Sequence, residues 1–293
     1  IFGQDHAVDD VVSAVKTSKA GIGNDEKPIC SFLFTGPTGV GKTELTKQLA
    51  FFLGIEFVRL DMSEFMEKHS ISKLIGSPPG YVGYEQGGYL TEEINKKPHS
   101  VLLLDEIEKA HPDIFNILLQ ILDYGNLADS NGRNINFKNT IIVMTSNTGA
   151  VEAEGESVGF IEQGTDDKFE KAVSKAFTPE FRNRLDGIVN FNSLTNNNLE
   201  SVVKKLIIEV EAKLNEKGID IEFNDDVIKL VLDEGYDPKL GARPLSRAVD
   251  KLIKKPISTM LIEDSIKRGS SVQLTVKSGK IDLKIVNRKE RIT

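Results

Sequence analysis

Residues 36–43 constrain the fold and the chemistry of this chain more than any other segment. They read Gly-Pro-Thr-Gly-Val-Gly-Lys-Thr and fit the phosphate-loop pattern G-x-x-x-x-G-K-[ST]. The apolar run 31–34 precedes them and a helical pattern begins near Thr43, which is the strand–loop–helix context that the motif requires. A glycine-rich turn that matched by chance would not need this context. The segment therefore predicts a site for a nucleoside triphosphate.

Each residue type in this loop suits a polyphosphate for a physical reason. Gly36, Gly39 and Gly41 have no Cβ, so backbone N–H groups can converge on the phosphate oxygens. Lys42 can reach the β- and γ-phosphates, and the Thr43 hydroxyl can ligate Mg²⁺. The following helix directs its positive N-terminal end at the same anion. The residues expected to bind the nucleotide here are Gly36, Pro37, Thr38, Gly39, Val40, Gly41, Lys42 and Thr43.

Short apolar runs alternate with helical patterns in the first part of the chain. The runs are Phe32–Phe34, Phe57–Leu60, Val101–Leu104, Thr140–Met144 and Ile188–Phe191. Such runs are typical of parallel strands that are buried on both faces, and helices between them imply right-handed crossovers. The pattern predicts an α/β domain with a parallel central sheet, whose ligand site lies beyond the carboxyl ends of the strands.

The pattern changes after about residue 192. An apolar stripe at helical spacing runs from Leu199 to Leu214, and further helices are expected at 227–232 and 245–262. Alternating runs at 271–276 and 280–286 predict a β-hairpin. We therefore expect two domains, a large one over 1–192 and a small, mainly helical one over 193–293.

Three polar residues follow other predicted strands. Asp105 and Glu106 end the run at 101–104, where Asp105 can support Mg²⁺ and Glu106 can polarise an attacking water. The alternative is that both acids cap the next helix. Asn147 follows the run at 140–144, where it can orient that water or contact the γ-phosphate; the alternative is ordinary turn chemistry.

Composition excludes several classes of protein. The chain has 293 residues and a net charge of −7, which argues against a nucleic-acid partner. The single cysteine, Cys30, allows no internal disulfide and predicts a reducing, cytoplasmic compartment, with an organelle interior as the alternative. No apolar stretch is long enough to span a membrane, the histidines lack metal-ligand spacing, and no hydrolase nucleophile set is evident. The chain begins without methionine, which suggests a module of a longer protein.

The order of these motifs resembles that of AAA+ ATPases over nearly the whole chain. The phosphate loop and Asp105-Glu106 are followed by Asn147, by Phe181-Arg182-Asn183-Arg184 and by Gly241-Ala242-Arg243. The match is similar to the second ATPase module of Clp/Hsp100 unfoldases, nearest to the ClpA type. The resemblance implies ATP and Mg²⁺ as cofactors, ADP as product, and a homo-hexameric ring.

The resemblance also implies roles for residues that spacing alone would not identify. Arg184 would reach the γ-phosphate in the neighbouring subunit, and Arg243 would reach the nucleotide of its own subunit. Guanidinium groups suit both roles because they stay ionised and oppose charge on a transferring phosphoryl group. The alternative for each is a surface ion pair, which we favour for Arg182. Phe2 lies in the segment whose backbone would pass near the adenine.

Two further segments resemble substrate and partner sites of this family. Tyr81 and Val82, between Gly80 and Gly83, resemble the axial pore loop, and a second loop near 128–134 is expected to face the same channel. Residues 150–168 are polar around Val158, Gly159 and Phe160, which resemble the tripeptide that docks on a ClpP-type peptidase. Valine stands where isoleucine is typical.

These features predict an ATP-driven unfoldase and translocase that threads unfolded or tagged proteins through a hexameric pore into a ClpP-type peptidase, with possible adaptor proteins as further partners. One alternative is a ClpB-like disaggregase that acts without a peptidase and would not need the 150–168 loop. Another is a low-turnover assembly module, in which nucleotide binding switches the protein between a ring and a free subunit. An AAA+ DNA-loading protein is disfavoured by the acidic balance.

Overall fold

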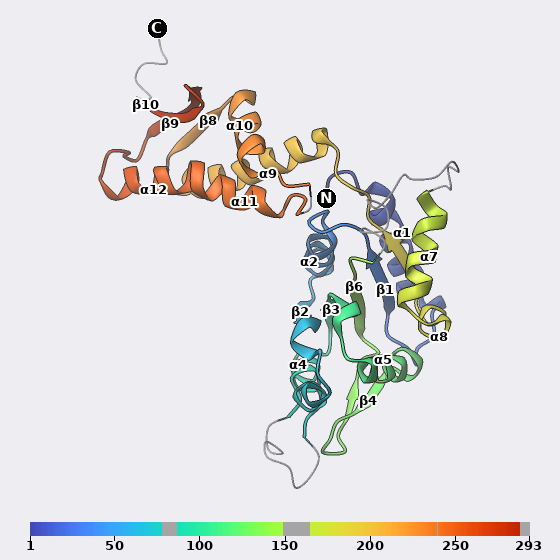
Figure 1. The fold of residues 1–293 in the computed structure, drawn as a ribbon. Helices are drawn as coiled ribbons and strands as arrows, with labels where there is room; N and C mark the ends of the chain where they lie inside the picture. Colours follow the sequence, from blue (N-terminus) through green and yellow to red (C-terminus); the bar gives the residue numbers. More distant parts are fainter. Residues whose placement is uncertain (78–86, 149–164, 239, 288–293) are drawn as a thin grey trace, which may run out of the picture. The chain divides into compact units, whose positions relative to one another are not determined.

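A computed structural model describes residues 1–77, 87–148, 165–238 and 240–287 (Figure 1). These residues divide into two compact units. The first contains Ile1, Gly3–Pro37 and Gly41–Asn192, and the second contains Phe2, Thr38–Val40 and the chain from Ser193 onward.

The first unit is built on a five-stranded sheet with the order β2-β3-β6-β1-β7. The strands are β1 (Cys30–Thr35), β2 (Glu56–Asp61), β3 (Ser100–Asp105), β6 (Thr140–Thr145) and β7 (Gly187–Asn190). All neighbouring strands run parallel, and every residue of β1, β3 and β6 is buried. This architecture confirms the predicted α/β fold, since strands covered on both faces need the continuous apolar runs that the sequence shows.

Helices connect these strands. They are α1 (Asp5–Thr17), α2 (Lys42–Leu53), α3 (Ile71–Ile75), α4 (Tyr89–Lys96), α5 (Pro112–Tyr124), α7 (Thr165–Ala176) and α8 (Pro179–Arg182). Short 3₁₀ turns occupy Met62–Phe65, Lys68–Ser70 and Ile107–Lys109. Helices α2 and α5 both end at a glycine with left-handed backbone, Gly54 and Gly125, which is a common helix C-cap.

The 128–134 segment differs from a plain loop. Strands β4 (Asn126–Ala128) and β5 (Asn134–Asn136) pair antiparallel, so this segment is the connection of a small hairpin. Within it, Asp129 accepts hydrogen bonds from the backbone N–H groups of Asn131 and Arg133, and its other oxygen accepts from Arg133 Nε at 2.7 Å. The hairpin is thus closed by one buried carboxylate.

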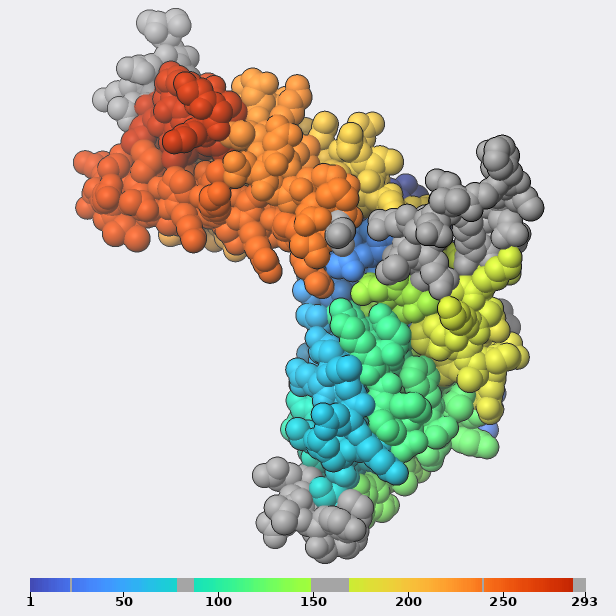
Figure 2. Space-filling view, in the orientation of Figure 1, coloured from blue at the N-terminus to red at the C-terminus, as the bar shows by residue number. Residues whose placement is uncertain are grey.

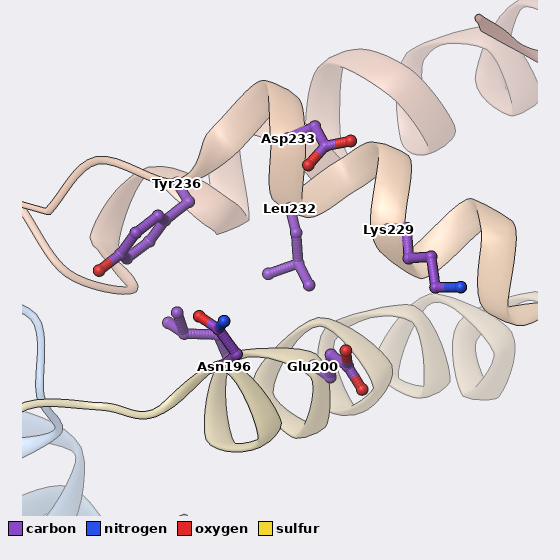
Figure 3. A pocket seen from close by; sticks show the side chains of 7 residues that line it. Asn196, Glu200, Lys229, Leu232, Asp233 and Tyr236 are labelled. Atoms are coloured by element: carbon purple, nitrogen blue, oxygen red, sulfur yellow. The ribbon is translucent and has the colours of Figure 1, made fainter.

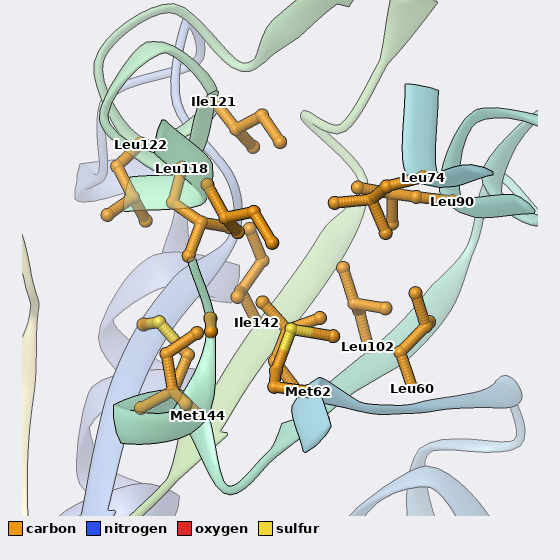
Figure 4. Close-up of a cluster of buried hydrophobic side chains, with 14 of the residues drawn as sticks. Leu60, Met62, Leu74, Leu90, Leu102, Leu118, Ile121, Leu122, Ile142 and Met144 are labelled. Carbon is orange, nitrogen blue, oxygen red and sulfur yellow. The ribbon is translucent and has the colours of Figure 1, made fainter. Parts of the chain in front are cut away.

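The core of the first unit lies between the sheet and its covering helices (Figure 4). Leu102 and Ile142 from adjacent strands meet Leu118 and Leu122 from α5, and Leu90 from α4 belongs to the same cluster. All five side chains are at most 1% exposed. This packing holds the strand ends that carry the polar residues in a fixed register.

The second unit is mainly helical. It contains α9 (Asn196–Asn215), α10 (Asp225–Gly235), α11 (Arg243–Val249) and α12 (Lys255–Ile262), with a three-stranded sheet of order β10-β9-β8. The predicted stripe on α9 is buried and forms part of a separate core. Atoms of the second unit around helix α12 lie at the surface, coloured orange to red in Figure 2. The Ile262 side chain at the end of this helix is 84% exposed.

Two details of the second unit differ from the predicted elements. The predicted helix over 245–262 is interrupted by a π-helical turn at Asp250–Lys254. This turn ends two residues before Pro256, whose missing N–H removes a donor from the helical hydrogen-bond ladder. The predicted hairpin forms from β9 (Ser270–Lys277) and β10 (Lys280–Asn287), and β9 also pairs in parallel with an unpredicted strand, β8 (Asp220–Phe223).

A cavity of 380 Å³ lies between α9 and α10 in the second unit (Figure 3). It is lined by Asn196, Leu199, Glu200, Lys229, Leu232, Asp233 and Tyr236. None of the residues predicted to bind nucleotide lines it. Among the helices that the structure describes, none is long and apolar enough to cross a membrane.

Candidate nucleotide site

The phosphate loop leaves the carboxyl end of β1 through backbone that favours glycine. Gly36 has φ +123°, and a Cβ there would lie 2.4 Å from the carbonyl oxygen of Phe191. Gly41 has φ +115° and immediately precedes α2. Side chains at these two positions would strain or block the loop, so glycine is required by the tertiary structure as well as by the motif.

Lys42 lies at the first position of α2 and is 8% exposed. Its ammonium group donates to the carbonyl oxygens of Gly36 at 2.5 Å and Pro37 at 2.9 Å, and to Asn147 Oδ1 at 3.1 Å. The lysine is therefore folded back over its own loop, and its head group joins the loop to the end of β6. Thr43, the next residue, lies in the same first turn of α2.

Asp105 ends β3 and is 7% exposed. Arg59 Nη2 lies 2.7 Å from its Oδ2, and the Thr145 hydroxyl donates to its Oδ1. An ionised carboxylate oxygen can accept more than one hydrogen bond, so both oxygens keep capacity for a further partner. Mg²⁺ prefers oxygen ligands, and Asp105 and Thr43 offer a carboxylate and a hydroxyl oxygen. Both residues therefore fit the predicted role of metal ligands.

Glu106 adopts left-handed backbone with φ 58° and ψ 51°, which is uncommon for a residue other than glycine. Its side chain is 26% exposed and forms an ion pair with Lys109, whose pKa is raised by that hydrogen bond. Its backbone N–H donates to the Thr145 hydroxyl at 3.1 Å. Because of this turn, Asp105 and Glu106 have different partners, and Glu106 pairs with a cation of its own, Lys109.

Asn147 lies just beyond the end of β6. Its backbone N–H donates to Glu108 Oε1 at 3.1 Å, and its side-chain oxygen accepts from Lys42. The following residue continues a local turn, since the Thr148 N–H donates to Ser146 Oγ. The structure thus brings Lys42, Asp105, Glu106 and Asn147 to the carboxyl ends of three adjacent strands, where a parallel sheet binds its ligand.

The two predicted arginines lie at different places in the fold. The Arg184 carbonyl accepts from Ser31 Oγ at 3.4 Å, which places it at the amino end of β1, opposite the phosphate loop. Its guanidinium pairs with Asp123 at 2.6 Å and Glu180 at 3.2 Å. Arg243 opens α11 in the second unit and is exposed. The N–H of the preceding residue, Ala242, donates to the Gly39 carbonyl at 3.2 Å, so the backbone at the start of α11 lies beside this part of the phosphate loop.

The remaining predicted residues are Phe2, Arg182 and the residues of the pore and docking segments. Phe2 is 38% exposed and follows Ile1, whose Cγ2 would lie 3.5 Å from a Cβ on Gly41, so the N-terminal segment lies beside the phosphate loop. Arg182 has a buried Nε without a hydrogen-bond partner among the described residues. The pore and docking residues lie outside the described ranges: Tyr81, Val82, Val158, Gly159 and Phe160.

Sequence reasoning missed four residues that contact the predicted acids or Asn147. They are Arg59, Glu108, Lys109 and Thr145. Thr145 stands two residues before Asn147 and carried a usable signal, a hydroxyl at the end of an apolar strand. Arg59 carried a weaker one, a cation inside a predicted strand. Neither Arg59 nor Thr145 could be identified as a partner of Asp105 from the sequence, because these contacts depend on the pairing of β2 and β6 with β3.

Comparison with known proteins gives two family matches. The model described as the AAA domain (Cdc48 subfamily) matches residues 27–188. The model described as the C-terminal, D2-small domain of ClpB protein matches residues 194–274. Together they cover most of both compact units.

Individual relatives carry two kinds of name. A "ClpA homolog protein" of Fuscovulum blasticum is 48% identical over 100% of this chain and 37% of its own length. An "ATP-dependent Clp protease ATP-binding subunit ClpA homolog" of Pyropia yezoensis is 46% identical over 100% of this chain and 38% of its own. A "Chaperone protein ClpB" of Vibrio cholerae is 46% identical over 96% of this chain and 33% of its own.

The chain spans about a third of the length of these relatives. Identity near one half over the whole chain, with relatives named ClpA homolog and ClpB, agrees with both domain matches. The chain belongs to the AAA domain family, within its Clp/Hsp100 branch of ATPases.

Proposed function

We propose that this chain is an ATP-hydrolysing motor module of a protein unfoldase and translocase, which acts in a homo-hexameric ring and delivers substrate polypeptides to a ClpP-type peptidase. The observation that carries the proposal is the convergence of Lys42, Asp105, Glu106 and Asn147, in which Lys42 Nζ lies 3.1 Å from Asn147 Oδ1. A cation, a metal-holding carboxylate, a base and a water-orienting amide are the groups that phosphoryl transfer to water requires.

The residues divide the work of hydrolysis. The loop N–H groups and Lys42 bind the phosphates, and Thr43 and Asp105 would hold Mg²⁺, which when bound neutralises charge on the phosphate oxygens. Glu106 accepts a proton from the attacking water, and Asn147 orients that water. Because Lys42 already contacts Asn147, binding of a γ-phosphate at Lys42 is sensed directly at the end of β6.

Two arginines would couple hydrolysis to movement. Arg184 lies at the opposite end of β1 from the phosphate loop, which suits a residue that acts on the nucleotide of another subunit. Arg243 opens a helix of the second unit and would contact the nucleotide of its own subunit. The resulting movement would drive Tyr81 and Val82 along the pore, and Val158, Gly159 and Phe160 would dock on the peptidase.

Two observations on relatives support different versions of this function. The Pyropia yezoensis relative is named as an ATP-binding subunit of an ATP-dependent Clp protease, which favours the version with a peptidase. The Vibrio cholerae relative is named a chaperone, ClpB, which favours a disaggregase without one. The apolar tripeptide at 158–160 inside a polar segment is the sequence feature that favours the first version.

The deciding experiment uses the intact protein with ATP, a ClpP-type peptidase and a tagged fluorescent substrate. We expect Phe160→Ala to abolish peptide release while ATP hydrolysis and loss of substrate fluorescence stay within about twofold of wild type, because a docking contact lies outside the hydrolytic site. Wild-type unfolding without any peptide release, unchanged by Phe160→Ala, would instead establish the disaggregase.

A further inference from the structure

The Thr145 hydroxyl forms hydrogen bonds with both predicted acidic residues, Asp105 and Glu106. Thr145 ends β6 and is 1% exposed. Its Oγ1 donates to Asp105 Oδ1 and accepts from the backbone N–H of Glu106 at 3.1 Å. One buried oxygen atom therefore joins the metal-holding carboxylate to the backbone of the base.

The direction of these two hydrogen bonds follows from their chemistry. An ionised carboxylate can only accept and a backbone N–H can only donate, whereas a hydroxyl has one proton and two lone pairs. The hydroxyl proton must therefore point at Asp105, and a lone pair must face Glu106. Valine has nearly the same shape as threonine but can make neither bond, while serine can make both.

The backbone at Glu106 explains why such a contact matters. Left-handed backbone is unfavourable for a residue other than glycine and persists only where neighbouring contacts fix it. The bond from its N–H to Thr145 fixes the start of the turn, and the bond from Lys109 N–H to the Glu106 carbonyl, at 2.9 Å, fixes its end. The direction of the Glu106 side chain thus depends on Thr145.

Arg59 holds the opposite side of Asp105. Its Nη2 lies 2.7 Å from Oδ2, so the carboxylate is gripped from β2 on one oxygen and from β6 on the other. Removal of the Thr145 contact would leave Asp105 held from one side only, free to turn towards Arg59. A change at Thr145 would consequently alter the metal-holding group and the base together.

We propose that Thr145 is a positioning residue for ATP hydrolysis, whose hydroxyl fixes Asp105 and Glu106 relative to each other. The inference rests on the proposed function, since it concerns the same reaction. It adds a residue that acts through the two acids.

The test compares Thr145→Val with Thr145→Ser in the intact protein, with Thr140→Val as a matched control. Thr140 is also fully buried on β6, but lies at the other end of the strand, where its hydroxyl donates to the Phe137 carbonyl. We expect Thr145→Val to lower kcat by about 10- to 100-fold, the range for residues that orient metal ligands. Its half-saturating Mg²⁺ concentration should rise severalfold, while Thr145→Ser and Thr140→Val stay within about threefold of wild type.

The Mg²⁺ dependence distinguishes positioning from simple packing, because loss of packing would lower the amount of folded protein without changing the metal concentration required. If thermal denaturation shows that Thr145→Val is unfolded, Thr145→Cys takes its place, since a thiol fills the site but hydrogen-bonds weakly. A folded Thr145→Val or Thr145→Cys protein with wild-type kcat and Mg²⁺ dependence would overturn the inference. A wild-type protein that hydrolyses no ATP would overturn the proposed function itself.

Discussion

Asp105 and Glu106 are adjacent in sequence but are held by different cations. Asp105 pairs with Arg59 from the neighbouring strand, whereas Glu106 pairs with Lys109 three residues later. The left-handed turn at Glu106 makes this separation possible, because it directs consecutive side chains to different partners. The two carboxylates therefore each have a cation of their own instead of competing for one.

The first prediction tests the proposed role of Glu106 as the base. We expect Glu106→Gln to keep ATP binding within about threefold of wild type and to lower the hydrolysis rate by at least about 100-fold, since the amide cannot take a proton. Nucleotide binding by calorimetry and phosphate release by a coupled assay measure the two effects. Glu26→Gln, at an exposed residue outside the site, is the control. Hydrolysis near the wild-type rate in Glu106→Gln would refute the role of this residue.

Cys30 provides a prediction about pH. The thiol is 2% exposed at the start of β1, and burial, together with the negative charge of Asp186, raises its pKa from 9.0 to about 12. The unfolded chain therefore releases the thiol proton at a lower pH than the folded chain, and this contribution to stability is present below pH 9 and lost as pH rises towards 12.

The expected loss of stability follows from the difference between the pKa of the thiol in the unfolded chain and its pKa in the folded chain. Relative to Cys30→Ala, wild type should lose about 1.4 kcal/mol of unfolding free energy between about pH 7.5 and about pH 10. Urea denaturation of both proteins at the two pH values measures it. A constant difference between wild type and variant would show that the thiol titrates alike in both states.

At the scale of elements, most helices and strands could be read from the sequence. The apolar runs of β1, β3 and β6 and the stripe of α9 repeat with the period of a buried strand or helix, and each pattern is local. The π-helical turn at Asp250–Lys254 and strand β8 were not predicted. Strand β8 is short, and within the described residues its strand partner is β9, about fifty residues further along the chain.

We predict that the β4–β5 hairpin depends on the carboxylate that closes it. The Asp129 side chain is 1% exposed and accepts from two backbone N–H groups and from the Arg133 guanidinium. We expect Asp129→Ala to speed amide hydrogen exchange across Asn126–Asn136 by about 10-fold or more, because hydrogen bonds to a charged group contribute about 1.5 to 3 kcal/mol.

The matched control for this hairpin is Asn134→Ala, since Asn134 is exposed on the same hairpin. Hydrogen exchange followed by mass spectrometry compares both variants with wild type. Equal exchange in Asp129→Ala and wild type would show that strand pairing alone maintains the hairpin.

At the scale of the whole molecule, the two compact units have separate cores. Ile142 on β6 belongs to the first core and Ile207 on α9 to the second, and both are 0% exposed. Each unit therefore contains the apolar burial that a domain needs in order to unfold cooperatively by itself.

This separation predicts that each core can be weakened alone. Ile207→Ala should lower the unfolding free energy of the second unit by about 2 to 5 kcal/mol and leave the sheet of the first unit unchanged, and Ile142→Ala should do the reverse. Hydrogen exchange at increasing urea concentration resolves the two units. A parallel shift of both units in either variant would mean that they unfold as one.

The sequence by itself determined the phosphate loop, the parallel sheet and the resemblance to Clp/Hsp100 ATPases, because each rests on short motifs or runs that can be recognised one at a time along the chain. It also indicated Asp105, Glu106 and Asn147, since each follows a readable strand. Only the tertiary structure decided which groups hold them. The contacts from Arg59 and Thr145 depend on the register of β2 and β6 against β3, and that register is set by the packing of the whole sheet.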